Sequence, residues 1–234
     1  MDPITLPRQK AEVLVNDFVK SVYQWMCIGL ALTGFIAYFV AGNNTLISIL
    51  RGNPMLLFVL IIAELGLVFA ISGMVNKMSS ATAATLFVIY SGLNGVVLSF
   101  VFLVYTRASI VSTFFICSAT FLACSIYGWT TKRDLTSLGG FFMMGLFGII
   151  IASIVNMFMH SSVIYYAISY IGVFVFVGLT AYDTQKLKNM ALTQPAGIDG
   201  SVVRKGAILG ALSLYLDFIN LFLMLLRIFG QGRD

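Results

Sequence analysis

The chain has 234 residues, of which 59% are hydrophobic and only 10% are charged. Soluble domains carry about 25% charged residues, and the mean hydropathy here is +0.97. These values exclude an ordinary soluble protein and predict an integral membrane protein. Basic residues exceed acidic ones by five, but they form no cluster typical of nucleic-acid binding, so we expect no nucleic-acid partner.

Seven apolar runs are long enough to cross a bilayer as helices, which takes about 20 residues each. The runs are apolar on all sides, whereas the strands of a β-barrel would alternate polar and apolar residues. The first run is too long for the core of a cleavable signal peptide, so we expect it to anchor the protein. In chain order we expect spans at Val22–Val40, Met55–Met74, Thr82–Thr106, Ser109–Thr130, about 137–158, about 163–183 and Ile208–Ile228.

The fifth and sixth spans come from one uninterrupted stretch. No charged residue occurs in the 48 residues from Leu135 to Tyr182. One helix of this length would extend about 72 Å, more than twice the hydrocarbon thickness of a bilayer. We therefore expect a turn at residues 156–162, NMFMHSS.

The connections between spans are short, so we expect one compact seven-helix domain at residues 22–230. Residues 1–21 are expected to form an N-terminal tail, and residues 231–234 a C-terminal tail. Residues 189–207, with Pro195, Gly197 and Gly200, are expected to form a loop outside the membrane.

The distribution of basic residues favours one orientation. With seven spans, ten of the 14 lysines and arginines fall on the N-terminal side and four on the other. Positive charge stays cytoplasmic, so we expect the N-terminus and the loop at 189–207 inside and the C-terminus outside. A six-span alternative, with one re-entrant segment, would place both termini inside. The ten are Arg8, Lys10, Lys20, Lys77, Lys132, Arg133, Lys186, Lys188, Arg204 and Lys205, and the four are Arg51, Arg107, Arg227 and Arg233.

Three acidic residues, Glu64, Asp183 and Asp217, fall in or at the edge of these spans. A charge at the bilayer centre costs about 2.5–3.5 kcal/mol on insertion scales, so such residues are candidates for function. Glu64 is either a third acid in an ion pathway or a neutral packing residue. Arg227 is the one comparable base.

Asp217 lies well inside the seventh predicted span, on a polar stripe that we expect to face the bundle interior. The alternative is a structural polar clamp. By helical spacing the stripe comprises Ser213, Asp217, Asn220, Met224 and Arg227.

Asp183 lies in GLTAYDTQKLK, residues 178–188. Lys186 and Lys188 can extend to the interface, so the helix can continue past Asp183; the alternative is a solvated residue at a helix end. Antiparallel sixth and seventh spans could bring Asp183 to Asp217. Two carboxylates in a low-dielectric site would share a proton and titrate as one unit.

Three segments closely resemble signature stretches of the Bax inhibitor-1 family, also called transmembrane Bax-inhibitor-motif proteins. They are GLTAYDTQKLK (178–188), LYLDFINLFLMLLRIFG (214–230) and YGWTTKRDLTSLGG (127–140). The resemblance extends over nearly the whole chain. The sequence is similar to the bacterial branch of the family, which implies that the protein is located in a bacterial inner membrane.

The resemblance implies a seven-helix bundle with the last helix central and a pH-sensitive calcium leak controlled by an aspartate pair. The pair maps onto Asp183 and Asp217, which would also form a weak transit site for Ca²⁺. In some relatives an arginine near the cytoplasmic end of the second span bonds the closed pair, and the nearest base here is Lys77. Further candidates for the pore or latch are Glu64, Asn220 and Arg227.

The leading hypothesis is therefore a proton-gated cation leak. Ca²⁺ takes 6–8 oxygen ligands, of which these side chains supply only part, so water would supply the rest. The second hypothesis is a scaffold or regulator that binds another membrane protein, because certain bacterial relatives lack the aspartates and bind a membrane-anchored AAA protease.

We expect no enzyme activity and no cofactor. An intramembrane aspartyl protease needs Gly-x-Gly-Asp in its second motif, and this chain reads LYLD. A retinal pump would need a lysine in the seventh span for its Schiff base. One histidine and dispersed cysteines exclude a zinc-type site.

Overall fold

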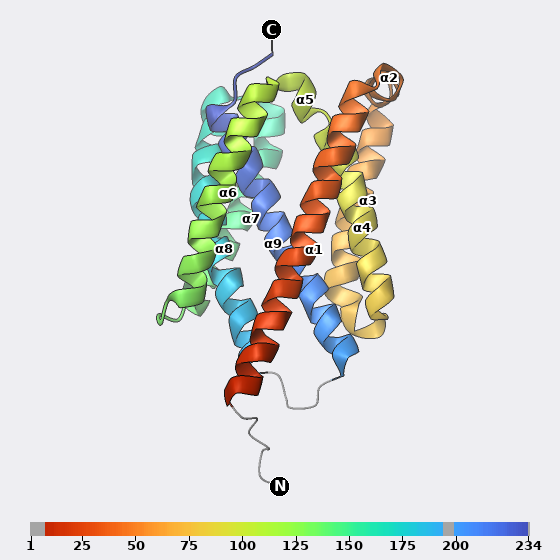
Figure 1. Cartoon of the computed structure of the whole chain (residues 1–234). Helices are drawn as coiled ribbons and strands as arrows, with labels where there is room; N and C mark the ends of the chain where they lie inside the picture. Colours follow the sequence, from red (N-terminus) through yellow and green to blue (C-terminus); the bar gives the residue numbers. More distant parts are fainter. Residues whose placement is uncertain (1–7, 194–198, 234) are drawn as a thin grey trace. The chain divides into compact units, whose positions relative to one another are not determined.

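The computed structural model describes residues 8–193 and 199–233, with side chains from residue 16 onward. The predictions for residues 1–7 and for Pro195 and Gly197 lie outside these ranges. The elements are α1 (Arg8–Gly42), α2 (Asn44–Gly52), α3 (Pro54–Met74), the 3₁₀ helix η1 (Val75–Lys77), α4 (Ser80–Leu98), α5 (Val101–Val104), α6 (Arg107–Thr130), α7 (Thr136–Met159), α8 (Ser162–Leu192) and α9 (Gly200–Phe229) (Figure 1).

Seven helical segments of the described chain are long and apolar enough to cross a membrane, which confirms the predicted all-α class. Each overlaps one predicted span. Many large apolar side chains on them are exposed, such as Phe69, Phe158 and Val163 at 74%, 75% and 77%, as expected where lipid rather than water surrounds a helix. The segments are Asn16–Gly42, Pro54–Lys77, Ser80–Val104, Arg107–Thr130, Thr136–Met159, Ser162–Leu192 and Gly200–Phe229.

The turn predicted at residues 156–162 is confirmed, because α7 ends at Met159 and α8 begins at Ser162. His160 closes α7 in the left-handed conformation, with φ of 51°. The Asn156 side chain accepts a hydrogen bond from the Ser161 N–H at 3.0 Å. These local bonds satisfy backbone groups that the end of a helix leaves free.

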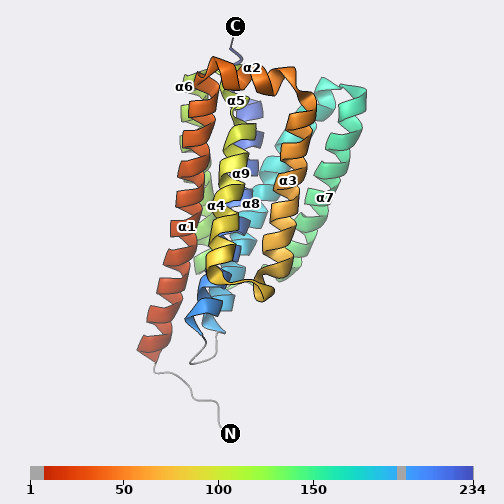
Figure 2. The same ribbon diagram turned by 90° about the vertical axis from the view of Figure 1, so that its right-hand side faces the viewer.

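α2 is an element that the sequence analysis missed. Figure 2 shows it running across from the end of α1 to the start of α3. Asn43 caps it, because the Asn43 Oδ1 accepts from the Thr45 and Leu46 N–H groups at 3.0 and 3.2 Å. On its inner side α2 buries Ile47 and Leu50. At nine residues it is too short to register as a span.

The helices flanking residues 194–198 are longer than predicted, so the predicted bounds of the loop at 189–207 are wrong. α8 continues to Leu192 and α9 already begins at Gly200. One cause is local: the Asp199 Oδ1 accepts from the Ser201 N–H at 2.9 Å and starts the helix early. α1 likewise begins at Arg8, within the predicted tail.

The chain divides into two compact units, which we call unit 1 and unit 2. Unit 1 comprises Met1–Val104 and Met190–Tyr215, and unit 2 comprises Tyr105–Asn189 and Leu216–Asp234. α9 contributes to the packing of both. In the most apolar stretch of α9, 72% of the residues are buried, against 6% in the corresponding stretch of α3. This burial confirms that the last helix is the most enclosed of the seven.

Candidate functional site

Asp217 is enclosed in the half of α9 that belongs to unit 2. Its side chain is only 6% exposed, and its Oδ2 has no hydrogen-bond partner in the described part of the chain. The following residue, Phe218, packs its ring edge-on against Phe114 and Phe121 of α6. An unpaired buried polar atom is costly and calls for a reason beyond packing. The carboxyl of Asp217 is therefore the strongest candidate for function in unit 2.

Asp183 belongs to the same unit and lies on α8, half-buried. Nine helical residues follow it, to Leu192, so it is not a solvated residue at the end of a helix. Burial of Asp217 is the main influence on its carboxyl, and the charge of Asp183 is a smaller one. That the two acids are in contact or share one proton stays a prediction.

Sequence reasoning missed Gln185, which lies two residues after Asp183 and is buried. Its Oε1 accepts a hydrogen bond from the Leu135 N–H at 2.8 Å, and its Nε2 donates to the Arg133 carbonyl at 2.8 Å. Both partners lie in the turn between α6 and α7. No sequence signal marks this role, because the partners are about 50 residues away in the chain.

Glu64 lies on α3 in unit 1 and is half-buried, and its Oε1 has no hydrogen-bond partner among the residues that the structure describes. Its charge acts on the hydroxyls of Tyr90 and Tyr215, whose ring centroids are 5.6 Å apart. Thr33 donates to the Ser91 carbonyl at 2.8 Å and is hydrogen-bonded to Tyr215 at 2.7 Å. Tyr90, Tyr215, Thr33 and Ser91 thus form a polar cluster in the same unit as Glu64. The sequence analysis did not predict this cluster, because tyrosine and threonine carry no charge that stands out in an apolar run.

The remaining predicted candidates have varied surroundings. Lys77 ends η1 in unit 1 and is exposed. The Asn220 Nδ2 donates to the Leu216 carbonyl of its own helix at 2.8 Å. The Arg227 guanidinium lies 5.0 Å from the centroid of the Tyr165 ring. Asn220 and Arg227 are half-buried, whereas most of their neighbours on α9 are buried. The expectation that their stripe faces the interior is therefore not confirmed, and roles of all three residues in a pore or latch stay predictions.

Within residues 8–193 and 199–233, no group of three or more His, Cys, Asp or Glu side chains is arranged to hold a metal ion. Ca²⁺ needs 6–8 oxygens, so two carboxylates would provide only a weak site completed by water. Such a site fits an ion in transit better than an ion that is stored.

Two carboxyls outside the spans have local structural roles. Asp134 accepts from the Thr136 hydroxyl at 2.6 Å and from its N–H at 2.9 Å, and these two bonds lower the pKa of Asp134. Asp199 accepts from the N–H and hydroxyl of Ser201, which lowers the pKa of Asp199. Both side chains are exposed and start helices, and we assign them no part in ion passage.

Fold and site together define a helical membrane protein with seven candidate spans and ionisable groups in its interior. The family described as inhibitor of apoptosis-promoting Bax1 matches residues 15–234. The chain therefore belongs to the Bax inhibitor-1 family, as its three signature-like segments indicated. The family is described by an inhibitory role rather than by a reaction.

Individual relatives match along nearly their whole length. The chain is 50% identical over 232 residues to the inner membrane protein YbhL of Escherichia coli strain K12, which covers 99% of this chain and 97% of that protein. It is 47% identical over 232 residues to an uncharacterized protein of Borreliella burgdorferi, covering 99% of each. An uncharacterized protein of Deinococcus radiodurans is 42% identical over 234 residues, covering 100% of this chain and 98% of that protein.

Proposed function

We propose that this protein is a pH-sensitive cation leak channel, conducting calcium, in the inner membrane of a bacterium. The observation that carries the proposal is the buried Asp217 carboxyl, whose Oδ2 has no hydrogen-bond partner among the described residues and which lies in the same unit as Asp183. Membership of the Bax inhibitor-1 family supports it. The inner-membrane location is supported by the name of the relative YbhL. The expected orientation has the N-terminus in the cytoplasm.

Protonation of the aspartate pair is the proposed gating step. Two neighbouring carboxylates in a low-dielectric site cannot both ionise cheaply. A proton added to the pair removes the repulsion between Asp183 and Asp217 and weakens their attraction to any nearby base. It thereby shifts the equilibrium between closed and open bundles.

The pH response should be graded rather than switch-like. A proton bound 100-fold more tightly in one state than in the other supplies about 2.7 kcal/mol. A shift from 1:99 to 99:1 requires about 5.5 kcal/mol. One shared protonation therefore changes the open fraction gradually over a range of pH.

The test is calcium flux into liposomes containing the purified protein, measured across a range of pH. Asp183→Asn and Asp217→Asn should each flatten the pH response, and the double variant should resemble either single one because the pair acts as a unit. The matched control is Asp199→Asn, which changes a carboxyl outside the spans but keeps an oxygen for Ser201. Additive effects of the two substitutions would refute the pair, and unchanged flux in both variants would make the carboxylates structural.

The competing function is a scaffold that binds another membrane protein, such as a membrane-anchored protease. It becomes the better account if the wild-type protein passes no cation at any pH. Crosslinking in native membranes followed by purification should then recover one defined partner. Repeated recovery of the protein alone would count against the scaffold.

A further inference from the structure

The part of α8 that carries Asp183 is held by hydrogen bonds to a turn of the chain. Gln185, only 7% exposed, uses both ends of its amide on backbone groups of the turn at residues 131–135: the Leu135 N–H and the Arg133 carbonyl. Leu135 is itself 4% exposed, and a buried backbone N–H needs an acceptor. Gln185 supplies that acceptor from another helix.

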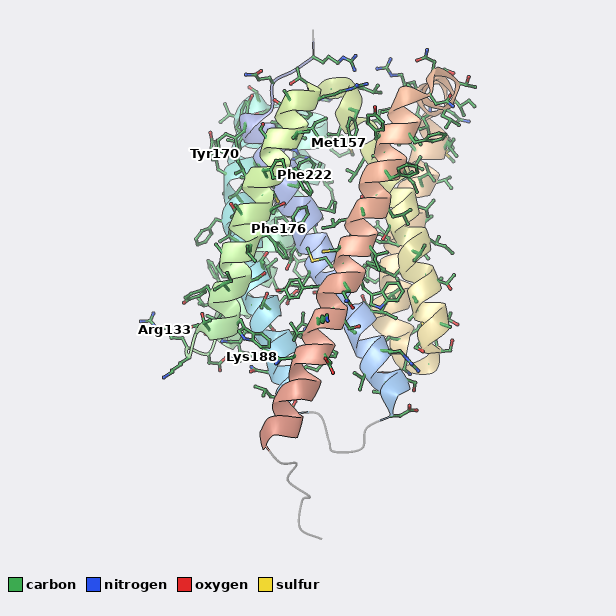
Figure 3. The ribbon with its side chains drawn as sticks, in the orientation of Figure 1. Arg133, Met157, Tyr170, Phe176, Lys188 and Phe222 are labelled. Atoms are coloured by element: carbon green, nitrogen blue, oxygen red, sulfur yellow. The ribbon has the colours of Figure 1, made fainter. Side chains whose placement is uncertain are left out.

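Lys188 makes a second attachment one helical turn later. Its Nζ donates to the Trp129 carbonyl at 2.6 Å and lies 5.6 Å from the centroid of the Trp129 ring. Trp129 is in the last turn of α6, where carbonyls have no partner within the helix. Figure 3 shows Lys188 and Arg133 at the same end of unit 2. Lys188 therefore caps α6 rather than only reaching towards the interface.

Close backbone packing holds the residues just before Asp183. A methyl group at Gly128 of α6 would overlap the Ala181 carbonyl, and one at Gly139 of α7 would overlap the Tyr182 ring. α6 and α7 therefore contact α8 directly at residues 181 and 182. Asp183 lies between this packing and the attachments at Gln185 and Lys188.

We propose that Gln185 is a positioning residue for Asp183. At 100° per residue, Gln185 and Asp183 lie about 200° apart around α8. When Gln185 is bonded to the turn, Asp183 is directed to the other side of the helix. Two hydrogen bonds from one planar amide fix both the rotation of α8 and its height against the turn. The Asp183 carboxyl is thereby held where it acts on Asp217.

The other charged groups near this segment have their own surroundings. Lys186 of α8 lies 6.0 Å from the centroid of the Tyr182 ring. The turn contributes three exposed charges, Lys132, Arg133 and Asp134, α6 carries only Arg107 at its first residue, and α7 carries none. Asp217 of α9 belongs to the same unit as Asp183 and is one of the groups on which the charge of Asp183 acts. Rotation of α8 therefore changes the placement of Asp183 relative to Asp217.

The functional part of this inference rests on the proposed channel, and two substitutions test it by flux. Gln185→Leu removes both hydrogen bonds at every pH. Gln185→Glu keeps both bonds only when the carboxyl is protonated, because an ionised carboxylate still accepts from the Leu135 N–H but has no hydrogen to donate to the Arg133 carbonyl. We expect Gln185→Leu to shift the midpoint of the pH response by on the order of half a pH unit or more. Gln185→Glu should match the wild type at low pH and depart from it at high pH.

A second measurement is independent of flux. The infrared carbonyl stretch of protonated Asp183, identified by its loss in Asp183→Asn, can be titrated in detergent. Its midpoint should move in Gln185→Leu and stay in place in Thr120→Val, which removes a hydrogen bond within α6 alone. If Gln185→Leu does not fold, the titration uses Gln185→Glu, for which we expect a midpoint displaced from that of the wild type.

The outcomes separate the two proposals. An unchanged infrared midpoint in a folded Gln185 variant overturns the positioning role. An infrared shift in a protein that passes no cation supports the positioning role and refutes the channel. Equal loss of flux at all pH values in Gln185→Leu and Gln185→Glu indicates general damage and also overturns the role.

Discussion

Glu64 and Asp217 each have one carboxyl oxygen, within an apolar helix, that has no hydrogen-bond partner among the described residues. Such oxygens are rare among buried polar groups. Glu64 lies in the unit that holds the Tyr90, Tyr215 and Thr33 hydroxyls, whereas Asp217 lies in the unit that holds the second acid, Asp183. Glu64 belongs to unit 1 and Asp217 to unit 2. Single substitutions can therefore test each carboxyl separately.

Glu64→Gln should reduce divalent cation flux by a few-fold while the protein still folds. The amide has the shape of the carboxyl but cannot carry the charge that attracts a cation in a low-dielectric site. Flux in liposomes and thermal unfolding in detergent provide the two readouts. Unchanged flux in Glu64→Gln would identify Glu64 as a neutral packing residue. If Glu64→Gln does not fold, the role of Glu64 is structural.

Asp134→Ala should lower the melting temperature at neutral pH, and the difference from the wild type should vanish in acid. The bonds from Thr136 lower the pKa of Asp134 in the folded protein. Its stabilisation is therefore complete above the unfolded pKa of about 3.9 and is lost as the pH falls through the lower folded value. Melting curves over this pH range provide the check. A difference that stays constant with pH would contradict the assignment.

At the scale of elements, α2 shows how a short helix can be stabilised between two spans. Its cap at Asn43 satisfies N–H groups of the first turn. Ile47 and Leu50 join a core with Val40, at the end of α1. The helix thus depends on one polar side chain and on two apolar ones, and the cap can be removed without disturbing the core.

Asn43→Ala should lower the free energy of unfolding by about 1 kcal/mol, the usual cost of losing such a cap. Denaturant unfolding in detergent measures the change. Asn44→Ala provides the matched control, since it alters the neighbouring residue inside the helix and leaves the cap in place. Equal destabilisation by the two substitutions would show that the cap is not the cause.

At the scale of the whole molecule, seven membrane crossings would place the two termini on opposite sides of the membrane. A reporter fused after Asp234 should be extracytoplasmic, and one inserted near Gly197 should be cytoplasmic, because ten of the 14 basic residues flank that side. Activities of reporters specific to each compartment provide the measurement. Two cytoplasmic signals would favour the six-span alternative.

Much of the site was predictable from particular residues. Asp183, Asp217 and Glu64 stand out because charge is rare in apolar runs, and the turn before α8 follows from the length of the uncharged stretch. The caps at Asn43 and Asp199 involve neighbours in the chain, so closer attention to short-range signals could have located α2 and the start of α9. The partners of Gln185 and the contacts of Tyr215 with Thr33 and Tyr90 could not be predicted, because the residues involved lie far apart in sequence.

The sequence by itself determined that this is a membrane protein of the Bax inhibitor-1 family with seven spans and three intramembrane acids. Span length and the avoidance of charge are properties of continuous segments, so no packing information is needed to recognise them. Only the tertiary structure decided that Asp183 and Asp217 lie in the same compact unit and that Gln185 fastens α8 to the turn before α7. Such contacts depend on the rotation and height of each helix against its neighbours, which are set by side-chain packing between segments distant in the chain.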